Sequence, residues 1–324
     1  RSPASVTKIM TLILIFDALE NGTLKMDDLV TTSAYAKSMG GSQVFLEEGE
    51  TQDVETMIKC IVIASGNDAS VAMAEHIGGS EQEFVRQMNE RAAGLGMENT
   101  HFVDCCGLTE STDHYTTVRD IAIMSRELIT HEKIFDYTLT WMDTVRNGET
   151  QLVNTNKLIR SYQGITGLKT GTTSQAGSCI TATAERDGLE LIGVVLGADS
   201  TDHRFQDAAA LLDYGFANWK VVVPKLPALE RVPVSRGMTS DVAPQAGESP
   251  KLLLQSTETG EVETNVSWKE LVAPISKGDV IGTVQYTLNG ETLAQVEITA
   301  GEDVEAVTFS SALGYLLSAL FGLS

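Results

Sequence analysis

The sequence has few positive charges. Its 324 residues include 44 Asp and Glu but only 23 Lys and Arg, which gives a formal net charge of −21 at pH 7. A chain with this charge does not bind nucleic acid or anionic lipid head groups through charge alone. We therefore expect no nucleic-acid partner, and any attachment to a membrane must rest on apolar contacts.

Cysteine is also scarce, and its spacing fits no metal site. The four cysteines are Cys60, Cys105, Cys106 and Cys179, with neither a C-x-x-C spacing nor a Cys/His pattern. Cys105 and Cys106 are adjacent and cannot easily bridge each other. We predict buried or incidental thiols and no metal. A chain of this length needs no disulfide to fold, so the thiols do not fix the compartment.

The first residues contain no positively charged segment followed by an apolar one, so this sequence shows no signal peptide. At the other end, residues 310–324 are apolar and uncharged. Even when extended back to residue 304, this segment is too short to span a bilayer comfortably, but it is long enough to lie on one. We predict a membrane-surface anchor at 304–324. The alternative is a terminal helix that packs on its own domain or on a partner subunit.

Helical patterns dominate the first 130 residues, and β-rich patterns follow. Apolar periodicity and start signals predict helices over residues 5–20, 54–63, 69–76, 81–95 and 117–128. Strands are predicted over 165–170, 178–184 and 189–196, and then a helix over 204–214 that stops at Gly215. This order predicts an α+β domain in which a helical cluster is inserted between the parts of a five-stranded or similar antiparallel sheet.

From residue 221 the sequence alternates between short strands and turns, with no long helix. The prolines at 224, 227, 233, 244 and 250 and the hairpin signal Asn289-Gly290 indicate a small all-β domain. We predict three parts: a first domain over 1–222, a β-rich domain over 223–303, and the apolar segment 304–324.

Ser5 and Lys8 lie three residues apart at the start of the first predicted helix. This spacing puts the hydroxyl and the amine on one helix face, where a neutral Lys8 can take the proton of Ser5. Burial against the apolar helix face would lower the pKa of Lys8. Alone, the pair is more simply a helix start with a surface lysine.

Two later motifs have similarly ambiguous meanings when each is considered alone. Ser65-Gly66-Asn67 can relay protons and hold a substrate backbone, or can be a simple turn. Lys169-Thr170-Gly171 lies on a predicted edge strand, where a peptide can add as a further strand and Gly171 allows close approach; the alternative is a Gly-rich hairpin. Together and in this order, however, S-x-x-K, S-x-N and K-T-G are the motif set of penicillin-binding proteins and class A β-lactamases.

The surrounding sequence narrows the match. The chain resembles the low-molecular-mass penicillin-binding proteins that act as D-alanyl-D-alanine carboxypeptidases, in the stretches PASVTKIMT, GSQVFLEEGE, IASGNDASVAMAE, HYTTVRDIA, NTNKLI, GITGLKTGTTSQAGSC and RFQDAAALLDYGF. These stretches cover residues 1 to about 220. The resemblance implies a β-lactamase-like catalytic domain, then a β-rich domain and an apolar anchor on the extracytoplasmic face of the bacterial cytoplasmic membrane.

The resemblance also implies roles for individual residues. Ser5 would be the nucleophile that forms an acyl-enzyme, Lys8 its general base, and Ser65 and Asn67 a proton relay and a substrate-binding amide. Substrate binding would further involve Lys169, Thr170, Gly171, Thr172 and Arg204, with the backbone N–H groups of Ser5 and Thr172 as the oxyanion hole. The substrate would be the D-Ala-D-Ala end of a peptidoglycan stem peptide. β-Lactams would acylate Ser5, and no cofactor would be required.

The sequence departs from the family in one respect, and its motifs are compatible with other functions. Family members carry strands ahead of the S-x-x-K helix, and these strands are missing here, so we expect the central sheet to lack them. A class A β-lactamase would carry an E-x-x-L-N loop, which the sequence does not contain. A transpeptidase or endopeptidase would share the same site residues. A non-catalytic envelope protein that binds muropeptides is a further alternative, but such a protein would not need Lys8.

Overall fold

The computed structural model describes residues 1–321, which form two compact units. The first unit runs from Arg1 to Ala217 and the second begins at Asn218. Each unit has a hydrophobic core of its own. The two units are therefore described separately.

The first unit contains a helical cluster and a central sheet. Its helices are α1 (Lys8–Glu20), α2 (Ala34–Lys37), α3 (Val54–Val62), α4 (Asn67–Gly78), α5 (Glu81–Gly94), α6 (Val118–Leu128), α7 (Ile134–Thr138) and α8 (Thr201–Asn218). Its strands are β1 (Leu29–Thr31), β2 (Thr51–Asp53), β3 (Met142–Val145), β4 (Thr150–Val153), β5 (Ile165–Thr173), β6 (Gly177–Arg186) and β7 (Leu189–Ala198). Short 3₁₀ turns are η1 (Ala4–Thr7), η2 (Arg146–Gly148) and η3 (Lys157–Arg160).

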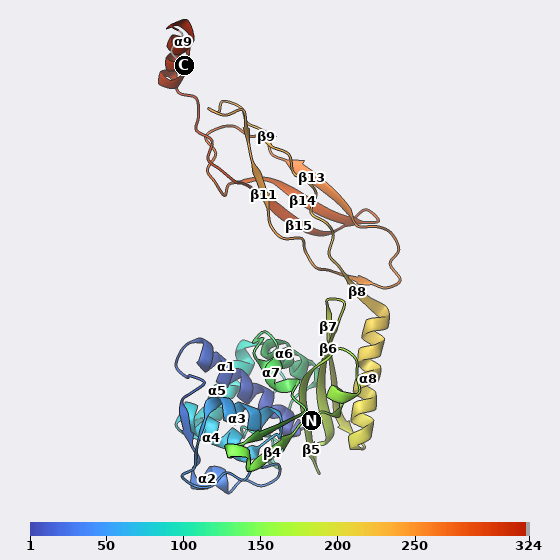
Figure 1. The fold of residues 1–324 in the computed structure, drawn as a ribbon. Coiled ribbons are helices and arrows are strands. Elements are labelled where there is room, and N and C mark those ends of the chain that lie inside the picture. Colours follow the sequence, from blue (N-terminus) through green and yellow to red (C-terminus); the bar gives the residue numbers. More distant parts are fainter. Residues whose placement is uncertain (322–324) are drawn as a thin grey trace. The chain divides into compact units, whose positions relative to one another are not determined.

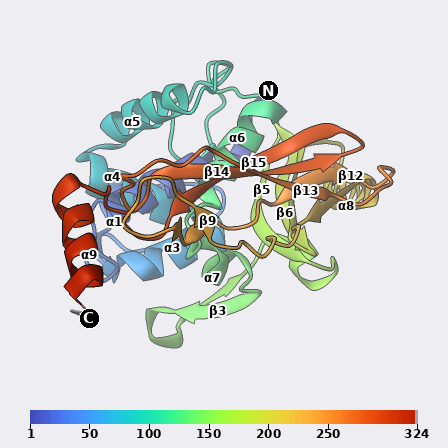
Figure 2. The same ribbon diagram turned by 90° about the horizontal axis from the view of Figure 1, so that it is seen from above.

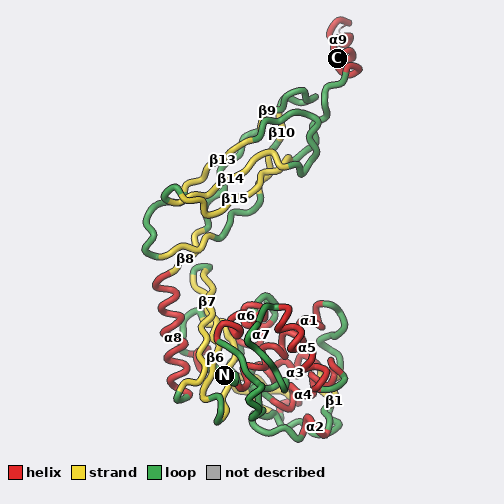
Figure 3. Tube along the Cα trace, turned by 180° about the vertical axis from the view of Figure 1, so that it is seen from behind, coloured by secondary structure: helices red, strands yellow, loops and turns green. Residues whose placement is uncertain are grey.

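The central sheet separates two layers of helices (Figures 1 and 3). Strands β5, β6 and β7 pair antiparallel in that order, so β5 is an edge strand, as predicted. Phe205, Ala208 and Leu212 of α8 pack on one sheet face, and the other face joins the large core of the helical cluster. Among residues 1–321 this sheet has three strands, whereas the order of the elements predicted a five-stranded or similar sheet.

Side-chain caps explain why several helices begin where they do. The side chains of Ser33, Asp53, Ser80 and Thr117 each accept a hydrogen bond from the backbone N–H three residues later. Such a bond satisfies one of the N–H groups that a helix leaves free at its start. The predicted starts of the helices over 54–63, 81–95 and 117–128 are confirmed to within one residue.

The predicted end of the last helix of this unit is wrong. Gly215 does not stop α8, which continues to Asn218. A Cβ atom at position 215 would lie 2.4 Å from the side chain of Leu191 in β7. This glycine therefore lets the helix approach the sheet closely, and that use of glycine cannot be distinguished from a stop signal in the sequence.

The second unit is built mostly from strands (Figures 2 and 3). They are β8 (Trp219–Val222), β9 (Val232–Pro233), β10 (Asp241–Val242), β11 (Pro244–Ala246), β12 (Leu252–Gln255), β13 (Glu263–Trp268), β14 (Val280–Leu288) and β15 (Glu291–Ala300). The largest sheet has the order β11-β15-β14-β13. The Asn289-Gly290 hairpin is confirmed: both residues have positive φ, at 51° and 84°, as a tight hairpin turn requires.

A last helix, α9 (Phe309–Phe321), ends the described chain. Within residues 1–321, no helix is long and apolar enough to cross a membrane. Residues 322–324 of the predicted anchor lie outside the described residues. Val304 belongs to the core of the β-rich unit, because it is 2% exposed and pairs with Ile275. Ala306 also packs against this core and pairs with Gly237, so the segment that is free of the core begins after residue 306.

Candidate active site

Ser5 lies in a tight turn that is fixed by contacts from two sides. The turn η1 precedes α1, whereas the sequence predicted a regular helix from Ser5 onward. Ala4 has a φ of 49°, which is unfavourable for a residue with a side chain. A Cβ atom on Gly107 would lie 1.9 Å from the carbonyl oxygen of Ala4, and one on Gly171 would lie 2.8 Å from the backbone nitrogen of Ser5. These two close approaches hold the turn in place.

Lys8 is fully buried, and hydrogen-bond acceptors from other residues surround its amine. Its Nζ lies 2.6 Å from Oδ1 of Asn67, 2.9 Å from the carbonyl oxygen of Cys106 and 3.0 Å from Oγ of Ser5. Burial lowers the pKa of Lys8. A neutral amine has two N–H groups and one lone pair. The two N–H groups can serve Asn67 and Cys106, which leaves the lone pair for the hydroxyl proton of Ser5.

Ser65 and Lys169 form a second hydrogen-bonded pair. Nζ of Lys169 donates to Oγ of Ser65 over 2.8 Å, although the two residues are 104 positions apart. Ser65 has a φ of 62°, a strained conformation for serine. Burial, followed by the nearby charges of Lys8 and Arg204, lowers the pKa of Lys169 well below its usual value.

Arg204 links the start of α8 to the edge strand. Its Nη1 donates to the carbonyl oxygen of Gly171 and to Oγ1 of Thr172, over 3.0 and 2.7 Å. Its Nε is buried and has no hydrogen-bond partner among the described residues. Thr170 behaves differently, because its hydroxyl donates to Oγ1 of Thr155 over 2.6 Å.

The structure thus brings the predicted residues together in three linked groups. Ser5, Lys8 and Asn67 form the first, Ser65 and Lys169 the second, and Arg204 with Thr172 and Gly171 the third. Lys8, Lys169 and Arg204 are three buried basic side chains, and none of them has an ion-pair partner among the described residues. Such a cluster favours an anionic group, for example a carboxylate.

Sequence reasoning missed the groups that position the motif residues. The carbonyl of Cys106 holds Lys8, and the carbonyl of Gly40 accepts a hydrogen bond from Nδ2 of Asn67 over 2.7 Å. The carboxylate of Asp68 accepts from the backbone N–H groups of Val44 and Leu46, and so holds the loop next to Asn67. Backbone groups carry no side-chain signal, so only the fold identifies them. The four thiols are buried and unpaired, as predicted.

No group of three or more His, Cys, Asp or Glu side chains within residues 1–321 is arranged to hold a metal ion. The chemistry that this arrangement can perform rests on the hydroxyl of Ser5, the amine of Lys8 and the N–H groups around them. A seryl nucleophile with an adjacent neutral amine can attack a carbonyl carbon and form an ester.

Comparison with known proteins agrees with this geometry. Residues 1–200 match the family described as D-alanyl-D-alanine carboxypeptidase, and residues 222–306 match the family described as penicillin-binding protein 5, C-terminal domain. The D-alanyl-D-alanine carboxypeptidase DacF of Bacillus subtilis is 42% identical over 315 residues, which cover 95% of this chain and 81% of that protein. DacC of Escherichia coli is 34% identical, with 94% and 78% covered.

Solved structures give the same result. Penicillin binding protein 5 of Haemophilus influenzae aligns with a TM-score of 0.75 and 30% identity, covering 94% of this chain and 91% of that one. A DD-transpeptidase of Streptomyces aligns over 67% of this chain and 89% of its own, with a TM-score of 0.62 and 30% identity.

The lowered pKa of Lys8 predicts a particular pH dependence. The rate of acylation of Ser5 by a fluorescent penicillin should fall as the pH drops through the folded-state pKa of Lys8. With rising pH, the rate should reach its plateau before the pH at which an ordinary lysine loses its proton, about 10.4. The unfolded chain keeps that proton up to higher pH, so this group makes the free energy of unfolding rise with pH in the same window.

The control for this pH profile is Lys8→Arg, whose guanidinium stays charged. Acylation of this variant should be slower by roughly 10²–10⁴-fold throughout the pH range. A plateau that begins only near the pKa of an ordinary lysine would contradict the role of burial.

The contact between Gly171 and Ser5 gives a second prediction. Gly171→Ala should displace the backbone of Ser5 and slow acylation by on the order of a hundredfold, because small misplacements of a reacting group are costly. Stopped-flow measurement of penicillin acylation tests this. Gly193→Ala in the same sheet is the matched control, since its new Cβ would meet its nearest neighbours at an ordinary 3.5 Å. Equal acylation rates in the two variants would refute the contact argument.

Proposed function

The chain belongs to the D-alanyl-D-alanine carboxypeptidase family, and from this membership and the site geometry we propose that Ser5 is its nucleophile and Lys8 its general base. Members of the family are serine-type hydrolases that act on peptidoglycan peptides, and this chain is such a carboxypeptidase. The observation that carries the assignment is the 3.0 Å distance between Oγ of Ser5 and the buried Nζ of Lys8.

The reaction has two half-reactions. In the first, Lys8 takes the hydroxyl proton while Oγ of Ser5 attacks the carbonyl carbon of the penultimate D-Ala. The bond to the terminal D-Ala breaks, and its amine takes a proton relayed through Ser65. In the second, water attacks the ester and Ser5 regains its proton. Penicillin-binding relatives have been solved with β-lactams bound, and we propose that β-lactams acylate Ser5 in the same manner.

Two backbone N–H groups are proposed to stabilise the charge that develops on the carbonyl oxygen. They belong to Ser5 and Thr172 and come from different elements, η1 and β5. The proposal is supported by the close approach of Gly171, the residue before Thr172, to the nitrogen of Ser5. Aligned N–H donors at such a position are among the largest single contributions to acyl transfer.

Recognition of the substrate's terminal carboxylate is proposed to involve Lys169, Thr172 and Arg204. The free, buried Nε of Arg204 supports this assignment, because a desolvated guanidinium without an acidic partner favours an incoming anion. Asn67 and the edge of β5 are proposed to hold the peptide backbone, with Gly171 leaving the strand edge open. Thr170 is proposed to orient the strand through Thr155.

A second activity on the same site is favoured by one comparison. The Streptomyces relative is named a DD-transpeptidase, so the same fold can pass its acyl group to an amine instead of water. A DD-endopeptidase or a β-lactamase would also use these residues. The named relatives with the highest listed identities are carboxypeptidases, which supports water as the main acceptor.

We propose that residues 1–222 carry the catalysis and that the β-rich unit, which extends past the predicted 223–303 to residue 306, forms a stalk. Of the predicted anchor 304–324, we propose that the part after residue 306 lies on a membrane surface outside the cytoplasm. The exposed apolar side chains of Phe309, Leu313 and Leu317 recur every four residues along α9, so they form one face. An apolar face of this kind is typical of helices that lie in the plane of a bilayer surface.

Release of D-Ala tests the catalytic proposal. The chain incubated with diacetyl-Lys-D-Ala-D-Ala should release free D-Ala, and Ser5→Ala should release none while keeping the unfolding temperature of the parent. Ser2→Ala, in the same segment, is the matched control and should remain active. Release by the Ser5→Ala variant would refute the site. If Ser5 binds penicillin but no D-Ala appears, an added amine acceptor would identify transfer instead of hydrolysis.

Removal of residues 309–324 tests the anchor. The truncated protein should lose binding to phosphatidylcholine vesicles in flotation assays, while its penicillin acylation should not change. Because the chain is strongly acidic, binding of the parent should not increase with anionic lipid or at low salt. Leu313→Glu should weaken flotation, and Ser310→Thr on the same helix should not. Unchanged flotation after truncation would refute the anchor.

A further inference from the structure

The β-rich unit carries an exposed tryptophan that lies flat on its sheet. Trp268 ends the edge strand β13 and is paired with Gly282 of β14. A Cβ atom at position 282 would lie 2.7 Å from Cε3 of the indole, so only glycine lets the ring lie against the neighbouring strand. One face of the indole is therefore covered by the backbone, while the residue remains 39% exposed. The same residue also lines a cavity.

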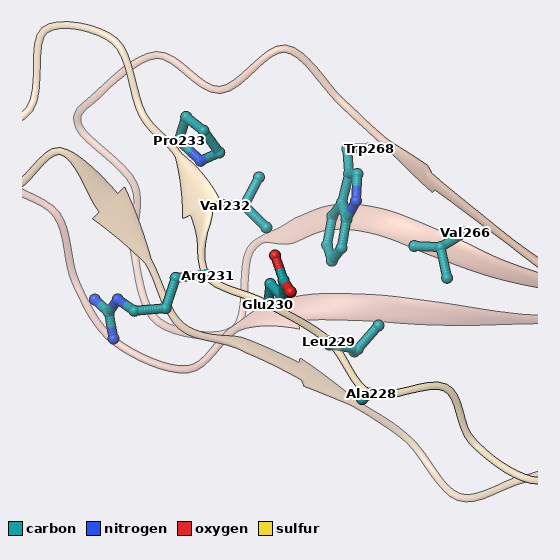
Figure 4. Close-up of a pocket in the computed structure, with 8 residues that line it drawn as sticks. All are labelled: Ala228, Leu229, Glu230, Arg231, Val232, Pro233, Val266 and Trp268. Carbon is teal, nitrogen blue, oxygen red and sulfur yellow. The ribbon is translucent and has the colours of Figure 1, made fainter.

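The cavity lined by Trp268 has a volume of about 290 Å³. Residues 228–233 form one wall, and Val266 and Trp268 form the other. Figure 4 shows the carboxylate of Glu230 projecting into the space between Val232 and the indole, with Leu229 and Val266 on the adjoining side. The cavity thus combines a flat aromatic plate, aliphatic walls and one carboxylate.

Glu230 is the only acidic side chain that lines this cavity among the described residues, and it makes no ion pair there. The neighbouring Arg231 points away from the cavity in Figure 4, because its guanidinium is bound to the carboxylates of Asp241 and Glu302. The cavity therefore offers hydrogen-bond acceptors without a balancing cation. It disfavours an anionic ligand, and it fits a ligand with an apolar face and with O–H or N–H donors along its edge.

We propose that this cavity, here called the Trp268 pocket, binds a pyranose ring of the peptidoglycan glycan strand. The C–H face of a pyranose ring packs on an indole face, and its hydroxyl or acetamido N–H groups can donate to Glu230. The volume is large for a single ammonium group and is near the lower limit of ordinary ligand sites, about 300 Å³. This proposal relies on the proposed function only in the choice of a peptidoglycan sugar as the ligand.

Such a contact would have a functional consequence for the enzyme. The peptide that the catalytic unit cleaves is attached to the same polymer as the sugar. Binding of the glycan by one unit would raise the effective concentration of stem peptides near the other, without any new contact in the active site. Hydrolysis of a short soluble peptide would not benefit, because that substrate carries no glycan.

The test measures binding and catalysis separately. The full chain is titrated with chitotetraose, an N-acetylglucosamine oligomer, and binding is followed by heteronuclear NMR. We expect saturable shifts at Trp268, and roughly tenfold weaker binding for Trp268→Ala. Release of D-Ala from diacetyl-Lys-D-Ala-D-Ala should be unchanged in this variant, whereas release from intact sacculi at low enzyme concentration should fall several-fold. Leu253→Ala, another exposed apolar residue of this unit, is the matched control and should behave as the parent.

Two further variants test the proposal if Trp268→Ala disturbs the sheet. Trp268→Phe retains a ring above Gly282, and Glu230→Gln changes an exposed side chain; both should weaken chitotetraose binding by a few fold with an unchanged unfolding temperature. No saturable binding, or equal binding in all variants, would overturn the proposal. Binding of a lysine-containing peptide without sugar, abolished by salt and by Glu230→Gln, would overturn it in favour of a cationic ligand held by the indole face and the carboxylate. The Ser5→Ala variant should lose D-Ala release from the soluble peptide and keep its binding to chitotetraose. The two proposals can therefore fail independently of each other.

Discussion

The active site depends on the removal of water from one amine. Lys8 lies on a helix whose residues are apolar on nearly all sides, and it is completely buried. A charged ammonium group is costly in such surroundings, and the hydrogen bonds that it donates to Asn67 and to the carbonyl of Cys106 only partly compensate for lost hydration. The same burial that makes the amine a usable base therefore also opposes folding when the amine is charged. Packing of the helical cluster must therefore provide the free energy that offsets the cost of burying this amine.

The surrounding backbone meets this demand by close packing that only glycine permits. Gly107, in a loop, and Gly171, in the edge strand, both lie very close to the backbone of the turn that holds Ser5. Ala4 in this turn has an unfavourable positive φ. Ser65 has a positive φ in the second motif. Strain of this kind persists only where the neighbouring structure fixes the backbone from several directions. Ser5 and Ser65 are thus positioned by tertiary contacts, and their local sequence would not hold them in these conformations.

These facts explain which features the sequence could predict. The three motifs identified Ser5, Lys8, Ser65, Asn67 and Lys169, because hydroxyl, amine and amide groups are visible as residue types. Thr172 and Arg204 lie outside these motifs, and Arg204 was expected only from the family resemblance. The helices with clear caps and the Asn289-Gly290 hairpin were also predictable, since their signals are local. Gly215 was misread as a helix stop because a glycine that permits close packing has the same letter as one that ends a helix. The carbonyls of Cys106 and Gly40 had no signal at all, since every residue has a carbonyl.

The electrostatic design of the catalytic unit follows from the same burial. Burial lowers the pKa of Lys8, Lys169 and Arg204, and the nearby charges of Lys8 and Arg204 lower the pKa of Lys169 further. A substrate carboxylate bound beside Lys169 and Arg204 would offset these shifts and favour their charged forms, while Lys8, held by Asn67 and Cys106, would remain the group best able to accept a proton. Binding of an anion would in this way assign different protonation states to two lysines in one cavity. A neutral substrate analogue would lack this effect, so a terminal carboxylate bound there would change the protonation of the site as well as the affinity.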